Sequence, residues 1–182
     1  MAKQFDRIGA DHAAFIRKQH LFFTASATAD SRINLSPKGL DALRVLDEQS
    51  VCWLDLTGSG NETAAHMRHD GRLTVMVCAF QGPPMILRLY GRGETLARGT
   101  AAYDALLADA FEGVEPPGAR QIVRLTVDLV QTSCGFAVPL YDYKGERESL
   151  IRWAESKGEA GLEAYRQDKN RVSIDGLDTG LA

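Results

Sequence analysis

Residues 34–39 combine side-chain types that bind anions. The segment runs Asn34-Leu-Ser-Pro-Lys-Gly, in which Ser36 supplies a hydroxyl donor, Lys38 a positive charge and Gly39 a position where a ligand can approach the backbone. Because the segment follows a predicted strand, a phosphate group could sit at that strand end. A turn whose lysine stays in water explains the same residues, so both interpretations remain open.

A second candidate anion site is the glycine-rich loop at residues 57–60. It leads into Asn61, Glu62 and Thr63 at the start of a predicted helix, where free N–H groups and the helix dipole favour phosphate. Helix capping by Ser59 or Asn61 explains the pattern without a ligand. Glu62 already complements the dipole and disfavours a phosphate nearby. The loop has no Gly-Lys-Ser/Thr ending of the kind that P-loops carry.

Two histidines and two arginines are the other residues considered for chemistry. His66 and His69 are three residues apart on the predicted helix, but no third ligand is evident, so a solvated helix face is predicted rather than a metal site. Arg88 and Arg92 lie on a predicted strand, where one of them could complete a phosphate site or both could line its solvated face. No Gly-x-Ser-x-Gly elbow anchors a hydrolase interpretation.

These residues depend on strands and short helices to position them. Strands are predicted at residues 21–29, 32–35, 50–56, 72–80, 85–97 and 121–131. Pro37 and Gly39 are expected to end the second of these strands. Helices are predicted at residues 11–20, 61–69, 100–111 and 146–167, with Thr100 as an N-cap and a break near Gly158 and Gly161.

The order of these elements predicts the fold class. Short turns join most of the strands, including the pair 72–80 and 85–97, so the sheet is not built from βαβ units. We therefore expect a mainly β protein with peripheral helices, whose strands form an antiparallel barrel. One domain is expected over residues 1–182, with a C-terminal helical extension at about 144–182.

Composition excludes several classes of protein. The formal net charge is −3 and the 21 lysines and arginines are scattered, so nucleic acid is not an expected partner. No apolar run suits a signal peptide or a membrane span, which predicts a cytoplasmic protein. Cys52, Cys78 and Cys134 lack any Cys-x-x-Cys spacing, so they are expected to be small core residues rather than disulfide or metal ligands.

Taken in order, several segments resemble the pyridoxamine 5'-phosphate oxidase-like flavoproteins over nearly the whole chain. The similar segments are FFTASATADSRINLSPKG at 22–39, WLDLTGSGNETAAHMR at 53–68 and LRLYGRGE at 87–94. The segments QTSCGFAVPLYDY at 131–143 and SIDGL at 173–177 resemble the members that carry a C-terminal helical extension.

The resemblance implies a homodimeric split barrel that binds FMN between its subunits and acts on a small-molecule substrate. Ser36 and Lys38 would face the FMN phosphate or ribityl chain, and Trp53 would lie near the flavin. The implied cofactor-binding residues are Asn34, Ser36, Lys38, Trp53, Asn61, Glu62, Thr63, Arg88, Arg92 and Cys134. No catalytic residue and no metal ligand is implied.

One departure from the family pattern bears on activity. Glu62 and Thr63 stand where the oxidases carry an Arg-Lys pair, and the C-terminus lacks their basic substrate-binding end. The expected function is therefore an FMN-dependent oxidoreductase of unassigned substrate rather than a vitamin B6 phosphate oxidase. The alternative is a flavin- or haem-binding protein without turnover, because related split barrels bind haem or a deazaflavin. His66 and His69 are the residues that would support haem.

Overall fold

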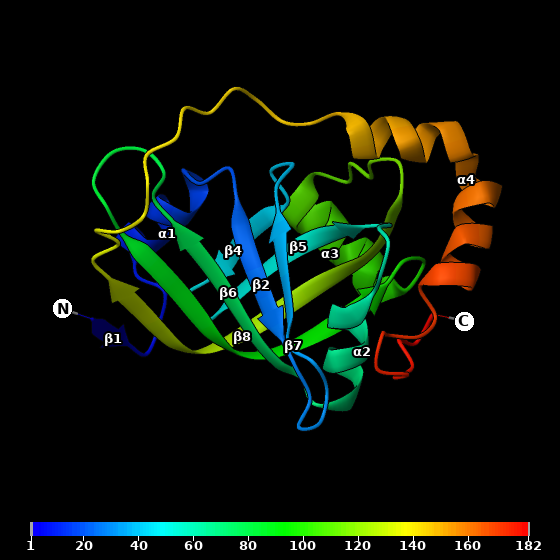
Figure 1. Cartoon of the computed structure of the whole chain (residues 1–182), viewed down its shortest axis with the longest axis horizontal. Helices are drawn as coiled ribbons and strands as arrows, with labels where there is room; N and C mark the ends of the chain where they lie inside the picture. The colour runs from blue at the N-terminus through cyan, green and yellow to red at the C-terminus, as the bar shows by residue number, and fades with distance from the viewer. Residues whose placement is uncertain (1, 182) are drawn as a thin grey trace.

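The computed structural model describes residues 2–181, which form eight strands and four helices (Figure 1). The strands are β1 (Lys3–Phe5), β2 (Phe22–Ser26), β3 (Asn34–Lys38), β4 (Leu43–Asp47), β5 (Ser50–Leu56), β6 (Arg72–Cys78), β7 (Ile86–Ala97) and β8 (Ala119–Ser133). The helices are α1 (Ala10–Arg17), α2 (Glu62–His69), α3 (Ala101–Phe111) and α4 (Ser149–Lys169).

The strands form one curled antiparallel sheet. Their order is β3-β2-β6-β7-β8-β5-β4, and β1 pairs with β8. The predicted antiparallel split barrel is confirmed, as are the hairpins β2–β3 and β6–β7. The expectation that Pro37 ends its strand is wrong, because β3 continues through Pro37 to Lys38. Proline is tolerated there because β3 is an edge strand that needs no second ladder of hydrogen bonds.

Strands β1 and β4 are absent from the sequence prediction. Both are short, and β4 is half-buried along most of its length without a clear alternation of buried and exposed residues. Each forms because a longer strand, β8 or β5, lies beside it. Because buried and exposed residues do not alternate along β1 and β4, the alternation that predicts strands does not detect them.

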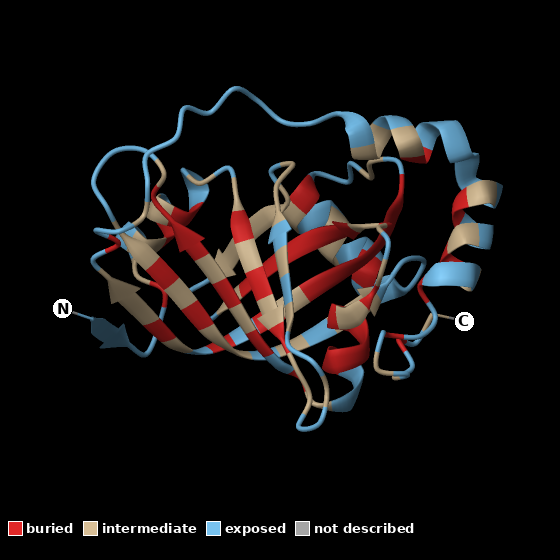
Figure 2. Cartoon of the chain, viewed as in Figure 1, coloured by how far each residue is buried: buried red, intermediate tan, exposed pale blue. Residues whose placement is uncertain are grey.

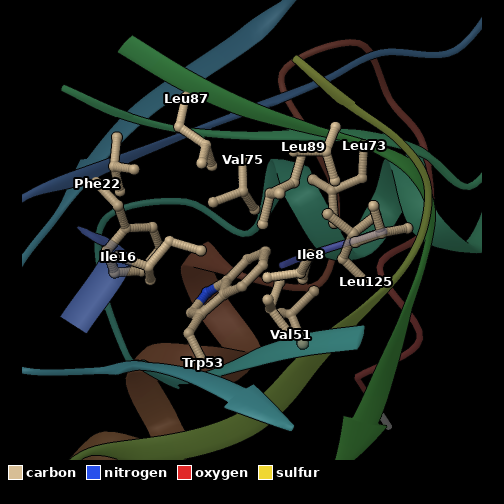
Figure 3. Close-up of a cluster of buried hydrophobic side chains, with 14 of the residues drawn as sticks. Ile8, Ile16, Phe22, Val51, Trp53, Leu73, Val75, Leu87, Leu89 and Leu125 are labelled. Atoms are coloured by element: carbon tan, nitrogen blue, oxygen red, sulfur yellow. The ribbon is translucent and has the colours of Figure 1, made fainter. Parts of the chain in front are cut away.

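The main core fills the inside of the curled sheet. Trp53 is fully buried at its centre and packs edge-to-face on Phe22, with their ring centroids 5.9 Å apart (Figure 3). Figure 2 shows buried and half-buried residues alternating along the strands that face the viewer. A second cluster lies between α3 and the outer side of β5 and β8, where it includes Cys52, Tyr103 and Ile122. Strand β5 is therefore buried on both faces.

The C-terminal extension lies against one end and one side of the barrel (Figure 1). Its helix α4 breaks at Gly158, where φ is 63° and ψ is 170°, as the sequence predicts, whereas Gly161 stays helical. Thr100 caps α3 by accepting a hydrogen bond from the Tyr103 backbone N–H, which is also as predicted. No helix in residues 2–181 is long and apolar enough to cross a membrane.

A buried ion pair joins the two sides of the open seam between β3 and β5. Lys38 at the end of β3 places its Nζ 2.9 Å from Asp55 Oδ1 on β5, although β3 and β5 are far apart in the strand order. Asp55 Oδ2 also lies 2.9 Å from Nε and Nη2 of Arg120 and accepts a hydrogen bond from Gln121. This contact shows that the sheet has curled into a barrel.

Gly91 allows the close crossing of β7 and β8. The pairing register of the two strands shifts between Tyr90 and Gly91. A Cβ atom added at Gly91 would lie 1.9 Å from the Thr126 carbonyl oxygen. Because the obstacle is backbone, no side-chain rotation can relieve it.

Gly91→Ala is therefore expected to destabilise the protein by about 3 kcal/mol or more, since it overpacks a fixed backbone contact. Chemical denaturation monitored by circular dichroism measures this loss. Gly58→Ala is the matched control, because nothing lies within 4 Å of its added Cβ. Equal stabilities for the two variants would contradict the close-approach argument.

Asp55→Asn is expected to lower the free energy of unfolding by about 3–5 kcal/mol, because it leaves two buried or half-buried cations without their counter-charge. Asp41→Asn, which removes a carboxylate exposed to solvent and paired with Arg44, should cost less than about 1 kcal/mol. Urea denaturation of the three proteins checks both values. A neutral effect at Asp55 would show that the pair does not hold the seam.

The same carboxylate predicts how stability depends on pH. Burial by itself would raise the pKa of Asp55, but Arg120, Lys38 and the hydrogen bonds hold this pKa well below the usual range. The unfolded chain therefore takes up this proton first, so the contribution of Asp55 is complete above about pH 4 and is lost as the pH falls further. Unfolding free energies measured from pH 6 to pH 2.5 should decline less steeply in Asp55→Asn than in the unmodified protein.

Candidate functional site

The polar residues predicted around β3 and the start of α2 come together in the structure. Asn34 Nδ2 donates to Thr63 Oγ1 at 3.1 Å, and Ser36 Oγ donates to Asn34 Oδ1 at 3.1 Å. The register of β3 with β2 places Asn34, Ser36 and Lys38 on the side of the sheet that faces the barrel interior. The hairpin and α2 thus join Asn34 and Ser36 to Thr63.

Lys38 carries the positive charge of this site. Its side chain is 23% exposed, and Asp55 takes one of its three N–H groups among the described residues. Lys38 and Arg120 are two cations around the single carboxylate of Asp55, so one positive charge is left in surplus. The partly exposed side of this group, at Ser36 and Lys38, therefore favours an anion.

The glycine-rich loop before α2 is held by residues far away in the sequence. Arg120 Nη1 donates to the Gly60 carbonyl at 3.0 Å, and Asn170 Nδ2 donates to the Gly58 carbonyl at 3.0 Å. Gln121 Nε2 donates to Asn61 Oδ1 at 2.8 Å. Asn61 is the N-cap residue, but its side chain makes no capping bond, and its Nδ2 has no partner among residues 2–181. The loop is thus built mainly by β8 and the C-terminal extension.

Glu62 points to the C-terminal tail rather than to a free anion site. Its two carboxylate oxygens lie 3.2 and 3.1 Å from the backbone nitrogen of Ile174, which donates to them. The next tail residue, Asp175, accepts a hydrogen bond from the Arg32 backbone N–H at 2.8 Å. The charge of Glu62 at the first turn of α2 therefore opposes phosphate binding, whereas the Asp175 carboxylate is paired with the Arg32 guanidinium.

His66 is buried, so the prediction of a solvated helix face is wrong for this residue, whereas His69 is exposed. His66 Nδ1 lies 2.9 Å from Ser26 Oγ, and its Nε2 is enclosed without a partner among the described residues. Burial lowers the pKa of His66, although nearby carboxylates such as Glu62 oppose the shift. Neither ring nitrogen is open to an external haem iron, and residues 2–181 contain no cluster of three metal-ligating side chains.

Trp53 does not lie where a flavin could stack on it. Its indole is completely buried among core side chains of the barrel (Figure 3). Sequence reasoning placed it near the cofactor because it comes just before the glycine-rich loop. The alternation of β5 instead turns Trp53 inward, together with Val51.

Arg88 lies in a separate region, on the outer face of the sheet. Cross-strand pairing places it between Met76 and Gln131, and Phe23 pairs with Met76 on the far side. This row of half-buried residues was missed by sequence reasoning, although alternation along β7 could have found it. No helix crosses this face of β2, β6 and β7 in Figure 1.

The two other candidates do not join the β3 group. Arg92 is exposed and donates to the Asp70 carbonyl oxygen near the far end of α2. Cys134 directly follows β8 and is exposed, so the prediction of a core cysteine is wrong there, whereas Cys52 and Cys78 are buried. The neighbouring Ser133 accepts a hydrogen bond from Arg88 Nη1 at 3.3 Å.

A cavity of about 680 Å³ adjoins Lys38 and Asp55. It lies between β3, β5, the end of α3 and the first turn of α4. Its wall combines aliphatic residues such as Leu54 and Ile151 with four more charged ones: Asp41, Arg44, Glu112 and Glu146. Its size is within the range of small-molecule sites. Lys38 is therefore reachable from a hollow large enough for a ligand.

Comparison with known proteins agrees with this architecture. The family model described as pyridoxamine 5'-phosphate oxidase matches residues 8–134. A curated relative, the pyridoxamine 5'-phosphate oxidase family protein ustO of Aspergillus flavus, is 38% identical, and the match covers 88% of this chain and 70% of the relative.

Solved structures share the fold at low sequence identity. A histidine-to-alanine variant of HupZ from Group A Streptococcus is 18% identical with a TM-score of 0.56, covering 69% of this chain and 99% of that one. A protein of Lactobacillus delbrueckii described as a putative pyridoxamine 5'-phosphate oxidase is 18% identical with a TM-score of 0.54, covering 69% and 94%. An FAD-binding protein of Mesorhizobium loti is 14% identical with a TM-score of 0.51, covering 72% and 97%.

The strand order, the curled antiparallel sheet and the match over residues 8–134 lead to one conclusion: the chain belongs to the pyridoxamine 5'-phosphate oxidase family.

Proposed function

We propose that this protein binds FMN and is an FMN-dependent oxidoreductase that acts on a small-molecule substrate. The observation that carries the proposal is the local positive charge that Lys38 and Arg120 leave around Asp55, on the same face of β3 as the Ser36 hydroxyl. Family membership supports a flavin. The fold is also that of an FAD-binding protein of Mesorhizobium loti.

Ser36 and Lys38 are the residues proposed to hold the FMN phosphate. A dianionic phosphate gains from the ammonium of Lys38 and from a hydroxyl donor, whereas the start of α2 offers the carboxylate of Glu62. Asn34 and Thr63 orient this group through their hydrogen bonds. We therefore propose that the FMN phosphate binds at the end of β3 rather than at the start of α2.

A bound flavin would supply hydride or electron transfer, and the protein would bind and orient it. The residues of this chain fix its anionic end and exclude water through the buried network around Asp55. His66 is sealed in the interior, so it is not proposed as an acid or base. Because Glu62 and Thr63 replace two cations of the vitamin B6 phosphate oxidases, that specific activity is not proposed.

A homodimer is part of the proposal. The outer row formed by Phe23, Met76, Arg88 and Gln131 is half-buried and has no helix across it (Figure 1). Exposed Ile33 and Leu35 extend the apolar surface at the edge strand or just before it. A second copy would cover this face, which would give the homodimer that the family resemblance implies. A cytoplasmic location is proposed with it.

The visible spectrum of the purified protein tests the proposal directly. Yellow protein with flavin absorbance, or colourless protein that gains it on titration with FMN, supports flavin binding, and mass spectrometry of the released ligand identifies it. Anaerobic mixing with NADH or NADPH then separates a reductase from a flavin-binding protein that stores or senses. A colourless protein that binds neither FMN nor FAD would remove the proposal.

Lys38→Ala is expected to weaken FMN binding by about 1.5–3 kcal/mol, roughly tenfold to more than a hundredfold, because it removes a charge-assisted contact. Ser36→Ala should cost about 1 kcal/mol, since it removes one neutral hydrogen bond. Isothermal titration measures both affinities, with circular dichroism to confirm that each variant is folded.

Arg92→Ala is the matched control for charge, because Arg92 is exposed and lies outside the β3 group. Its FMN affinity should stay within about twofold of the unmodified protein, as the charge lies in water beyond the contact range. Unchanged affinity in folded Lys38→Ala, or an equal loss in Arg92→Ala, would refute the proposed phosphate site.

A further inference from the structure

A second hollow, of about 930 Å³, lies where three segments distant in sequence meet. The segments are the end of α1 with residues 18–21, the turn between β6 and β7, and residues 141–144 after β8. Figure 1 shows the chain after β8 passing beside that turn. We call the hollow the aromatic pocket, after the rings that line it: Phe15, His20, Phe80, Tyr141 and Tyr143.

The rings of the aromatic pocket are arranged in pairs between segments. His20 and Tyr143 are stacked, with ring centroids 3.6 Å apart and planes 4° apart. Phe80 and Tyr141 are also stacked, at 5.4 Å and 28°. The Tyr141 backbone N–H donates to the Phe80 carbonyl at 2.9 Å, so the tyrosine is fixed to the turn. Stacking covers one face of each of these four rings, and all four residues line the hollow.

Exposure distinguishes these tyrosines from core aromatics. Tyr141 is 62% exposed and Tyr143 is 43% exposed, although both line a hollow. Large apolar groups that remain uncovered in a concave surface are typical of ligand sites. Further uncovered ring surface is thus available for stacking.

The charged residues of the aromatic pocket indicate the charge of its ligand. Lys18 and Lys144 are balanced by Asp11 and Asp142, so the lining has no net charge. A carboxylate or an ammonium group on the ligand would gain no net attraction there. Pro83, Pro84 and Met85 complete the wall without adding charge.

We propose that the aromatic pocket binds flat, uncharged aromatic small molecules. A planar ring gains offset-stacked or edge contacts with the paired rings, which a saturated molecule of the same size lacks. The site is separate from Ser36 and Lys38, and the proposal does not rest on flavin binding. Because Met85 directly precedes β7, the pocket lies at the end of the sheet face that carries Arg88.

The test uses 2-naphthol as the aromatic probe and decahydro-2-naphthol as its saturated counterpart. Both are titrated into the protein with and without saturating FMN, by calorimetry and by amide chemical-shift mapping. 2-Naphthol should bind at least about tenfold more tightly than the saturated alcohol, and more tightly than 2-naphthoate. The shifted amides should lie in residues 14–21, 80–85 and 141–144.

Tyr141→Ala and Tyr143→Ala should each weaken 2-naphthol binding roughly tenfold. Tyr143→Phe should retain it, because the ring remains after the hydroxyl bond to Glu146 is lost. Phe136→Ala is the matched control, since Phe136 is exposed on the same segment but does not line the pocket.

Equal affinity for the aromatic and saturated alcohols would overturn the proposal, as would an equal loss in Phe136→Ala. Displacement of 2-naphthol by FMN would also overturn it, because the pocket would then hold the flavin ring. Binding of 2-naphthol to protein that takes up no flavin would leave this proposal intact while removing the flavin proposal, so the two failures are distinguishable.

Discussion

The buried carboxylate of Asp55 organises both the fold and the candidate site. It lies at the seam where the sheet has curled round, and it accepts hydrogen bonds from Lys38 on β3 and from Arg120 and Gln121 on β8. A buried charge is tolerated only when it is paired and fully hydrogen-bonded. The curl of the sheet, the position of Lys38 and the charge of the site therefore depend on one another.

The same network reaches the C-terminal extension. Arg120 donates to Asn170 Oδ1 at 2.9 Å and to the Gly60 carbonyl, so β8 links the tail to the loop before α2. Arg166 of α4 donates to Thr57 Oγ1 at the beginning of that loop. The loop conformation is thus set by the extension as much as by its own glycines, and a change in the extension is transmitted to the start of α2.

The contacts of the C-terminal extension explain the structural role of the Glu62 carboxylate. The family resemblance implies a cation at this position, whereas here the carboxylate accepts a hydrogen bond from the backbone N–H of Ile174. A negative side chain in the first turn of a helix is favourable for the helix itself. Because Glu62 contacts the C-terminal tail rather than a phosphate, the proposed anion site is at Lys38, at the end of β3.

Local propensity and alternation in the sequence determined a mainly antiparallel sheet, the paired hairpins, the helix cap at Thr100 and the break at Gly158. The family resemblance selected the split barrel. The family resemblance, rather than a local pattern, assigned Asn34, Ser36 and Thr63 to one site, and these three side chains are linked by hydrogen bonds in the structure. Tertiary structure alone decided that Trp53 and His66 are buried and that Glu62 faces the tail. It also decided that Lys38 is paired with Asp55. These outcomes depend on contacts between residues tens of positions apart, which no local pattern encodes.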